Sequence, residues 1–314
     1  MIRLQIHKSA YDNYSVNNQT KGIYFALLAV LGGGLYAIPY RLSLETANAL
    51  PVIWGVFLCA FLFSLPGAWL ARHQTKYSWK IAGISLATSL AGVLGNYSIC
   101  QALNLASPTL MVLLMRSEVI IAMILGWMFL KEFVTVRIFT AVVLILAGIL
   151  VMKLDSLSFE IKEWSAILWA FSAAFGFASM QVLAKSIIHE IHPQVLNVFR
   201  LAIGLALLWC VEEVRSDIPA LHISEWIWIA MAAFCGPFWG RVAFTYTLRH
   251  LTISKANIIV SFAPVMTLLF EFLVFGTLIS WLETLGGAIM LAAITVSYTH
   301  LRAHETEADV VCRL

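Results

Sequence analysis

Charged residues are scarce in this sequence. Asp, Glu, Lys and Arg together make up 12% of the 314 residues, and 61% are hydrophobic. A soluble domain carries about 25% charged residues. The net charge of +3 includes no basic run or arm, so the electrostatic pattern of a nucleic-acid-binding protein is missing. The composition therefore excludes an ordinary soluble domain and gives no support to a nucleic-acid partner.

Cysteines and enzyme motifs are also scarce. Four of the five cysteines lie inside apolar segments, and no CxxC pair occurs, so we expect small buried side chains without disulfides or a structural metal. The stretch His189-Glu190-Ile191-His192 has one residue between Glu190 and His192, where the HExxH zinc motif has two. Neither a GxSxG elbow nor a P-loop is present. We expect no cofactor, no metal site and no enzymatic activity.

Long apolar runs are what the sequence has in abundance. Each is long enough to cross the hydrocarbon core of a bilayer, about 30 Å thick, and lipid leaves backbone groups no partner except within a helix. The alternation typical of a β-barrel strand is absent. We predict an all-α polytopic membrane protein with ten transmembrane helices at residues 22–41, 50–71, 79–101, 107–130, 134–152, 164–187, 193–213, 225–247, 254–275 and 279–297.

The distribution of Lys and Arg predicts the orientation, because cytoplasmic loops carry the excess of these residues. With a cytoplasmic N-terminus, eleven lie inside: Arg3, Lys8, Lys21, Arg72, Lys76, Lys80, Lys131, Arg137, Lys185, Arg249 and Lys255. Four lie outside: Arg41, Lys153, Lys162 and Arg215. We therefore expect a multi-pass protein of the cell's inner (plasma) membrane with its N-terminus in the cytoplasm.

The two halves of the chain repeat each other weakly. A shift of 145 residues places Gly95-Asn96 on Gly240-Arg241 and Leu146-Ala147 on Leu291-Ala292. Five helices per half is an odd number, so the second half must insert upside down, as in many secondary transporters. We divide the chain into a cytoplasmic segment (1–21), a first repeat (22–152), a second repeat (164–297) and a tail (298–314).

Several short stretches of the two repeats are distinctive. In the second repeat they are Gly236-Pro237-Phe238-Trp239-Gly240, Thr247-Leu248-Arg249-His250-Leu251 and Ala263-Pro264-Val265. In the first they are Gly92-Val93-Leu94-Gly95, Ala102-Leu103, Lys131-Glu132 and Leu146-Ala147-Gly148. These stretches resemble the EamA family of the drug/metabolite transporter superfamily. The resemblance implies ten helices, cytoplasmic termini, and export or exchange of metabolites.

The chain departs from the family pattern in two places. Val119 stands where the family has proline, and Thr277 stands where it has the glutamate matched in the first repeat by Glu132. The stretch from Ser297 to Thr306 resembles translated sequencing-adapter read-through. We therefore interpret residues 298–314 as a tail that is not native to the protein.

Among the charged residues of the predicted spans, we single out five. They are Arg116, Glu118, Arg200, Arg241 and Glu271. A charge at the centre of a membrane helix costs about 2.5–3.5 kcal/mol on insertion scales, so such a group faces a cavity or a partner. Three arginines against two glutamates leave one positive charge, which a substrate carboxylate or phosphate would balance. In the alternative interpretation, the arginines pair with the glutamates or with helix carbonyls and only hold helices together.

Glu118 and Glu271 are the candidates for proton coupling, Glu118 foremost, because a desolvated carboxyl group can alternate between charged and neutral forms. Arg116 and Glu118 are two residues apart and point about 200° from one another on a helix, so we expect each to face a different neighbour. A permanent ion pair with an arginine is the competing interpretation of Glu118.

Amide and aromatic side chains lie at similar levels in the predicted spans. Asn96 is the repeat partner of Arg241, and near it in level are Tyr97, Gln101, Trp239 and Tyr246. Such groups suit a cavity that binds an amphipathic solute. Any one of these aromatic residues is equally compatible with simple packing or contact with lipid.

The sequence therefore predicts a secondary transporter that works by alternating access on a small metabolite with an anionic group, such as an amino acid. Its partners would be this solute and the lipid bilayer, with a homodimer left open. Two other classes remain: a membrane-embedded enzyme acting on a lipid-like substrate, and a membrane receptor or assembly factor. Turnover by purified protein, or a stoichiometric protein partner, would distinguish them.

Overall fold

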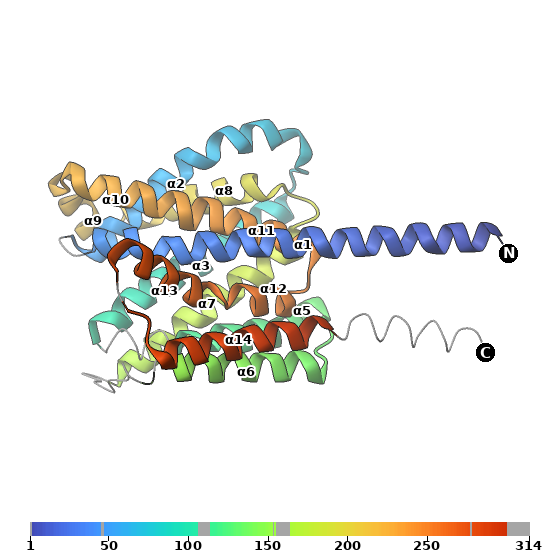
Figure 1. The fold of residues 1–314 in the computed structure, drawn as a ribbon. Coiled ribbons are helices and arrows are strands. Elements are labelled where there is room, and N and C mark those ends of the chain that lie inside the picture. The colour runs from blue at the N-terminus through green and yellow to red at the C-terminus, as the bar shows by residue number, and fades with distance from the viewer. Residues whose placement is uncertain are drawn as a thin grey trace.

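A computed structural model describes residues 2–44, 47–105, 114–152, 154, 164–276 and 278–299. Within these ranges the regular structure is entirely helical (Figure 1). The helices are α1 (Ile2–Ser43), α2 (Ala49–Ala71), η1 (Arg72–Gln74), α3 (Trp79–Leu105), α5 (Ser117–Leu130), α6 (Val136–Met152), α7 (Ser165–Ile187), α8 (Pro193–Trp209), α9 (Glu212–Asp217), η3 (Ile218–Ala220), α10 (Ile223–Ala233), η4 (Phe234–Gly240), α11 (Arg241–His250), α12 (Ile253–Val260), α13 (Ala263–Phe275) and α14 (Trp281–Thr299).

Five of the described helical stretches are long and apolar enough to cross a membrane: Asn18–Tyr40, Ala49–Gln74, Ser165–Ile187, Ile223–His250 and Ile253–Val274. Four shorter apolar helices are Ser117–Leu130, Val136–Met152, Pro193–Trp209 and Trp281–Thr295. The helix α3 occupies the predicted span 79–101. The predicted helix 107–130 lies partly outside the described residues. The total of ten spans stays a prediction.

The helix α1 is longer than the predicted first span. It runs from Ile2 to Ser43 without a break, through the segment that we expected to be a separate cytoplasmic region. The physical reason is visible in the sequence, because no proline or glycine occurs before Gly22 to stop a helix. In Figure 1 this part of α1 extends well beyond the other helices.

Two of the predicted second-half helices are interrupted. The span 225–247 divides into α10, the π-helical turn η4 and α11, and η4 contains Pro237. Proline has no N–H to donate, so the helix widens locally. The span 254–275 divides at Ser261 and Phe262 into α12 and α13, with Pro264 in the first turn of α13. Both interruptions free backbone groups near the middle of the protein.

Helix packing repeats between the two halves. The helix α1 packs on α10, η4 and α11, and its counterpart α7 packs on α3. In the same way, α1 packs on α12 and α13 while α7 packs on α5, and α2 packs on α10 and η4 while α8 packs on α3. The pairs α2–α8, α5–α12 and α6–α14 are their own counterparts. This pattern is typical of a protein with an approximate two-fold axis between its halves.

Close helix contact is clearest between α6 and α14, which lie side by side in Figure 1. A Cβ atom at Gly148 would lie 2.7 Å from Met290 Cγ and 2.8 Å from the carbonyl oxygen of Gly286. Only a residue without a side chain fits there. Small residues that let backbones approach are the usual means by which membrane helices associate.

We therefore expect the substitution Gly148→Leu to lower the midpoint of thermal unfolding of detergent-purified protein by several degrees, since overpacking costs roughly 1–3 kcal/mol. Gly83→Leu is the matched control, because a Cβ atom at Gly83 of α3 meets nothing within 4 Å. Equal midpoints for the two variants would contradict the proposed tight contact between α6 and α14.

Candidate functional site

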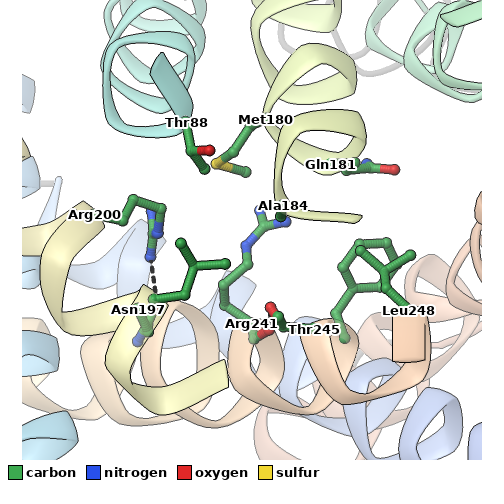
Figure 2. Close-up of a pocket in the computed structure, with 11 residues that line it drawn as sticks. Thr88, Met180, Gln181, Ala184, Asn197, Arg200, Arg241, Thr245 and Leu248 are labelled. Atoms are coloured by element: carbon green, nitrogen blue, oxygen red, sulfur yellow. Dashed lines mark hydrogen bonds between the residues drawn. The ribbon is translucent and has the colours of Figure 1, made fainter. Parts of the chain in front are cut away.

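A small cavity lies between α3, α7, α8 and α11. It offers about 20 Å³ to the centre of a water molecule, which is room for about one water. Figure 2 shows arginine side chains from α8 and α11 directed toward it. The lining residues are Thr88, Met180, Gln181, Ala184, Leu196, Asn197, Arg200, Arg241, Phe244, Thr245 and Leu248. In this conformation the cavity is too small for a metabolite.

Arg200 is the most firmly positioned charge in the cavity. Its side chain is 6% exposed, and its Nη2 atom donates to Asn197 Oδ1 over 2.8 Å (Figure 2). Asn197 Nδ2 in turn donates to Ser64 Oγ and to the carbonyl oxygen of Pro237, both at 3.0 Å. The Nε atom of Arg200 is buried without a hydrogen-bond partner. The guanidinium is thus held in place but not fully satisfied.

Arg241 enters the cavity from a different direction. It is the first residue of α11, immediately after the π-helical turn, and Figure 2 shows its guanidinium near Ala184. Its Cζ atom lies 5.8 Å from the ring centroid of Phe244, and Arg200 Cζ lies 5.8 Å from that of Phe57. These distances allow weak cation–π attraction. The two guanidinium groups repel each other across the small cavity.

Glu118 lies beside the cavity on α5. Its Oε1 atom accepts a 2.5 Å hydrogen bond from Gln181 Nε2, and Arg241 and Arg116 attract its charge. Arg116 does not continue the helix of Glu118, because residue 116 is a turn that precedes α5. Arg116 Nε is buried without a hydrogen-bond partner. The charges of the two residues interact, and that they face different neighbours stays a prediction.

The charge balance around the cavity is positive. Among the described side chains, Arg116, Arg200 and Arg241 contribute three positive charges, and Glu118 contributes one negative charge. The side chain of Glu271 lies outside the described residues. The arrangement is suited to hold an anion, because a carboxylate or phosphate accepts from guanidinium groups in their own plane.

The predicted residues of the first repeat lie away from the cavity lining. Asn96 Nδ2 donates to the carbonyl oxygen of Gly92, one turn back on α3, over 2.7 Å. Tyr97 is 37% exposed and packs edge-on against Trp169. Gln101 is half-buried near the end of α3. A substrate role for these residues stays a prediction, to which this conformation adds no contact.

The predicted aromatic residues of the second repeat also pack elsewhere. The ring of Trp239 in η4 lies 6.2 Å from that of Phe234. The hydroxyl of Tyr246 is 2.7 Å from His192 Nε2, and its ring stacks on Phe25. The neighbouring Thr245 lines the cavity in its place.

Comparison with known proteins shows which family has this architecture. A family model described as the EamA-like transporter family matches residues 20–154 and, a second time, residues 164–299. The chain belongs to the EamA-like transporter family. Among the solved structures that match, one titled "Crystal structure of protein" has a TM-score of 0.77 at 16% identity, with 91% of this chain and 99% of that chain covered. This likeness shows a shared fold. No curated protein matches.

The cavity of this EamA transporter contains polar residues that the sequence did not single out. They are Thr88 on α3, Gln181 on α7, Asn197 on α8 and Thr245 on α11. Asn197 could have been found, because it precedes Arg200 by three residues and therefore lies on the same face of its helix. The others carry no signal of this kind, since a single Thr or Gln is tolerated in many positions of an apolar helix.

Hydrogen bonds between the ends of α7 and α11 hold these two helices together next to the cavity. Lys185 follows Ala184 of the lining, and its ammonium donates to the carbonyl oxygens of Leu248 and Leu251 at the end of α11. In return, Arg249 of α11 donates to the carbonyl oxygens of Ile188 and Ile191 just beyond α7, at 3.1 and 2.8 Å. Each helix thus places a cation at the negative end of the other.

Glu132, just beyond the end of α5, adds two contacts to the same region. Its Oε2 atom accepts from the backbone N–H of Ile253, the first residue of α12, over 2.8 Å. Its Oε1 atom lies 3.9 Å from Lys185 Nζ. Burial raises the pKa of the Glu132 carboxyl above its ordinary value, against the opposing effects of the Ile253 N–H and of Lys185. Burial therefore outweighs the partners of this carboxylate.

The raised pKa predicts the sign of a pH effect on stability. A carboxyl group whose pKa is raised in the folded state contributes stability below its ordinary pKa of 4.5, and this contribution is lost as the pH rises through the folded value. We expect the unfolding midpoint of Glu132→Gln to fall less than that of the wild type as the pH rises from 4.5.

The matched control for this comparison is Glu190→Gln. Glu190 forms a 2.9 Å ion pair with Lys80 at the surface, so this variant makes the same change of Glu to Gln away from the contacts of Glu132. The measurement is thermal unfolding of the purified wild type, Glu132→Gln and Glu190→Gln at a series of pH values. Parallel curves for Glu132→Gln and the wild type would contradict the prediction.

Proposed function

We propose that this EamA transporter is a secondary transporter, an exporter or exchanger, of a small metabolite with an anionic group, such as an amino acid or a related compound. The observation that carries the proposal is the pair of guanidinium groups in one cavity, that of the buried Arg200 and that of the half-buried Arg241. Hydrophobic side chains of Met180, Leu196 and Phe244 share the lining. A solute with an anionic group and an apolar part matches this combination.

Positive charge remains at the cavity after the charge of Glu118 is counted. Removing an ion from water carries a penalty of several kcal/mol unless a counter-ion and hydrogen bonds replace its hydration. Arg200 has one amide acceptor and an unpaired Nε atom, and Arg241 shares Glu118 with Arg116. A bound carboxylate would supply the missing acceptors, and a planar guanidinium recognises it with two parallel hydrogen bonds.

The small volume of the cavity favours alternating access. A site with room for about one water must open before a metabolite can enter, and the Lys185–Glu132 contacts close one way in. We assign residues 22–152 and 164–297 as two inverted five-helix halves that rock about the cavity, giving ten spans in all. The repeated packing of the helices supports this assignment.

The excess of Lys and Arg in the loops assigned to the inside supports a cytoplasmic N-terminus and a location in the cell's inner membrane. Glu118 is our candidate for proton coupling, since it is a carboxyl group beside the arginines of the cavity. Glu271 remains a second candidate from the sequence. With no ATP-binding motif in the chain, transport would use a gradient or an exchange of solutes.

The test is counterflow in proteoliposomes loaded with a pool of labelled metabolites. We expect the wild type to accumulate at least one anionic solute and Arg200→Met to lose this activity by tenfold or more, since a lost charge-assisted hydrogen bond is worth about 1.5–3 kcal/mol. Arg72→Met is the matched control, because Arg72 lies on η1 over the exposed Trp69 ring, away from the cavity.

Equal accumulation by the wild type and Arg200→Met would reduce Arg200 to a structural role and remove the anion from the proposal. No accumulation of any pooled solute by folded wild-type protein would contradict transport of such metabolites altogether.

A further inference from the structure

Three polar side chains, two of them buried and Glu118 half-buried, are linked by hydrogen bonds across three helices beside the cavity. Asn257 Nδ2 of α12 donates to Gln181 Oε1 of α7 over 2.7 Å, and Gln181 Nε2 donates to Glu118 Oε1 of α5 over 2.5 Å. Gln181 and Asn257 are 4% and 6% exposed. Gln181 also lines the cavity with Arg200 and Arg241. The chain therefore links the wall of the substrate site to α12.

The direction of these hydrogen bonds has a chemical consequence. An amide group has a donating nitrogen on one side and an accepting oxygen on the other. Because Asn257 donates to the oxygen of Gln181, the nitrogen of Gln181 must point toward Glu118. A donor directed at a carboxyl group favours its charged, accepting form. In this conformation the orientation of Asn257 thus adds, through Gln181, to the attraction of Arg241 and Arg116 that favours the charged form of Glu118.

The same three side chains have a second complete arrangement. When Glu118 takes up a proton from water, one O–H bond forms at its carboxyl group and no other covalent bond changes. That O–H can donate to Gln181 once the Gln181 amide has turned over. The nitrogen of Gln181 then faces Asn257, which accepts it after its own amide has turned. If only one amide turns, two donors or two acceptors face each other, so the two amides reverse together.

Among the described residues, only two charged side chains act on Glu118. Arg241 of α11 and Arg116, which precedes α5, attract its negative charge, whereas α7 and α12 contribute the uncharged Gln181 and Asn257. The helix α12 is a short piece of eight residues between two interruptions. The turn that follows α12 is linked to Asn257 as well, because Ser261 Oγ donates to the carbonyl oxygen of Asn257 over 2.7 Å.

We propose that Asn257 is a positioning residue that holds Glu118 in its anionic form through Gln181, and that proton uptake by Glu118 reverses both amides. The proposal rests on the proposed function in that it makes Glu118 the group that couples protons to transport. In the anionic form Glu118 competes with the substrate for Arg241. In the protonated form it leaves the arginine to the substrate, and the reversed amides carry this change to α12.

The test is an infrared titration of purified protein, in which protonated carboxyl groups are followed by their C=O stretching band, beside the pH profile of counterflow. Among the bands of the titrating carboxyl groups of the wild type, we expect one that Glu118→Gln removes. Asn257→Leu keeps the number and branching of the side-chain heavy atoms and has no donor. Without that donor Gln181 can turn its oxygen to the protonated carboxyl group with no second amide to turn, so the midpoints of the band and of transport should shift about half to one pH unit upward.

The matched control is Ser89→Ala, which removes a buried hydroxyl that donates to the carbonyl oxygen of Ser85 on its own helix α3 and should keep both midpoints of the wild type. If Asn257→Leu does not fold, Gln181→Met takes its place, since it withdraws the only hydrogen bond donated to Glu118 in the described structure. It should shift the midpoints in the same direction.

A folded Asn257→Leu protein with the midpoints of the wild type would overturn the proposal, and so would a wild-type protein without a band that depends on Glu118. The infrared titration needs no substrate. A shifted band in a protein that transports nothing would therefore contradict the proposed function while supporting the role of Asn257, so the two failures can be told apart.

Discussion

Burial of guanidinium charge is the constraint on which the rest of the site depends. Arg200 and Arg241 stay charged in almost any protein environment, because the guanidinium group releases its proton only at very high pH. Away from water they require acceptors, and the fold supplies only some of them. Asn197 serves Arg200, and Glu118 attracts Arg241. The missing acceptors are the reason for proposing an anionic ligand, which would complete the hydrogen bonding of both groups.

The interruptions of the helices have their explanation in the same constraint. Pro237 widens the chain into a π-helical turn, which frees the carbonyl oxygen of Pro237 to accept from Asn197. The same turn ends at Gly240, so Arg241 begins a new helix at the edge of the cavity. The irregular backbone thus lies where polar side chains are available to satisfy it, as membrane proteins require.

The sequence is enough to single out Arg200 and Arg241 as candidates, but it does not predict which residues surround them. Arg200 and Arg241 could be identified because a charge within an apolar run has a large cost and therefore a purpose. Tyr97 and Tyr246 were candidates of a weaker kind, since an aromatic ring is stable against lipid, against protein or in a cavity. Tyr97 packs against Trp169 and Tyr246 contacts His192, and no pattern in the sequence specifies either partner. Gln181 is the clearest omission, because its role depends on Glu118 and Asn257, which are distant in the sequence.

The two halves are alike in packing and unlike in chemistry, and their chemistry leads to the most direct test. Both arginines of the cavity come from the second half, and Asn96, the repeat partner of Arg241, bonds its own helix. The decisive measurement is equilibrium binding to purified protein of carboxylic acids paired with their primary amides, which differ in charge and little in shape. The account predicts that at least one acid binds tenfold or more tightly than its amide, and that Arg200→Met removes the difference. Equal affinity of acid and amide for every compound that binds would contradict it.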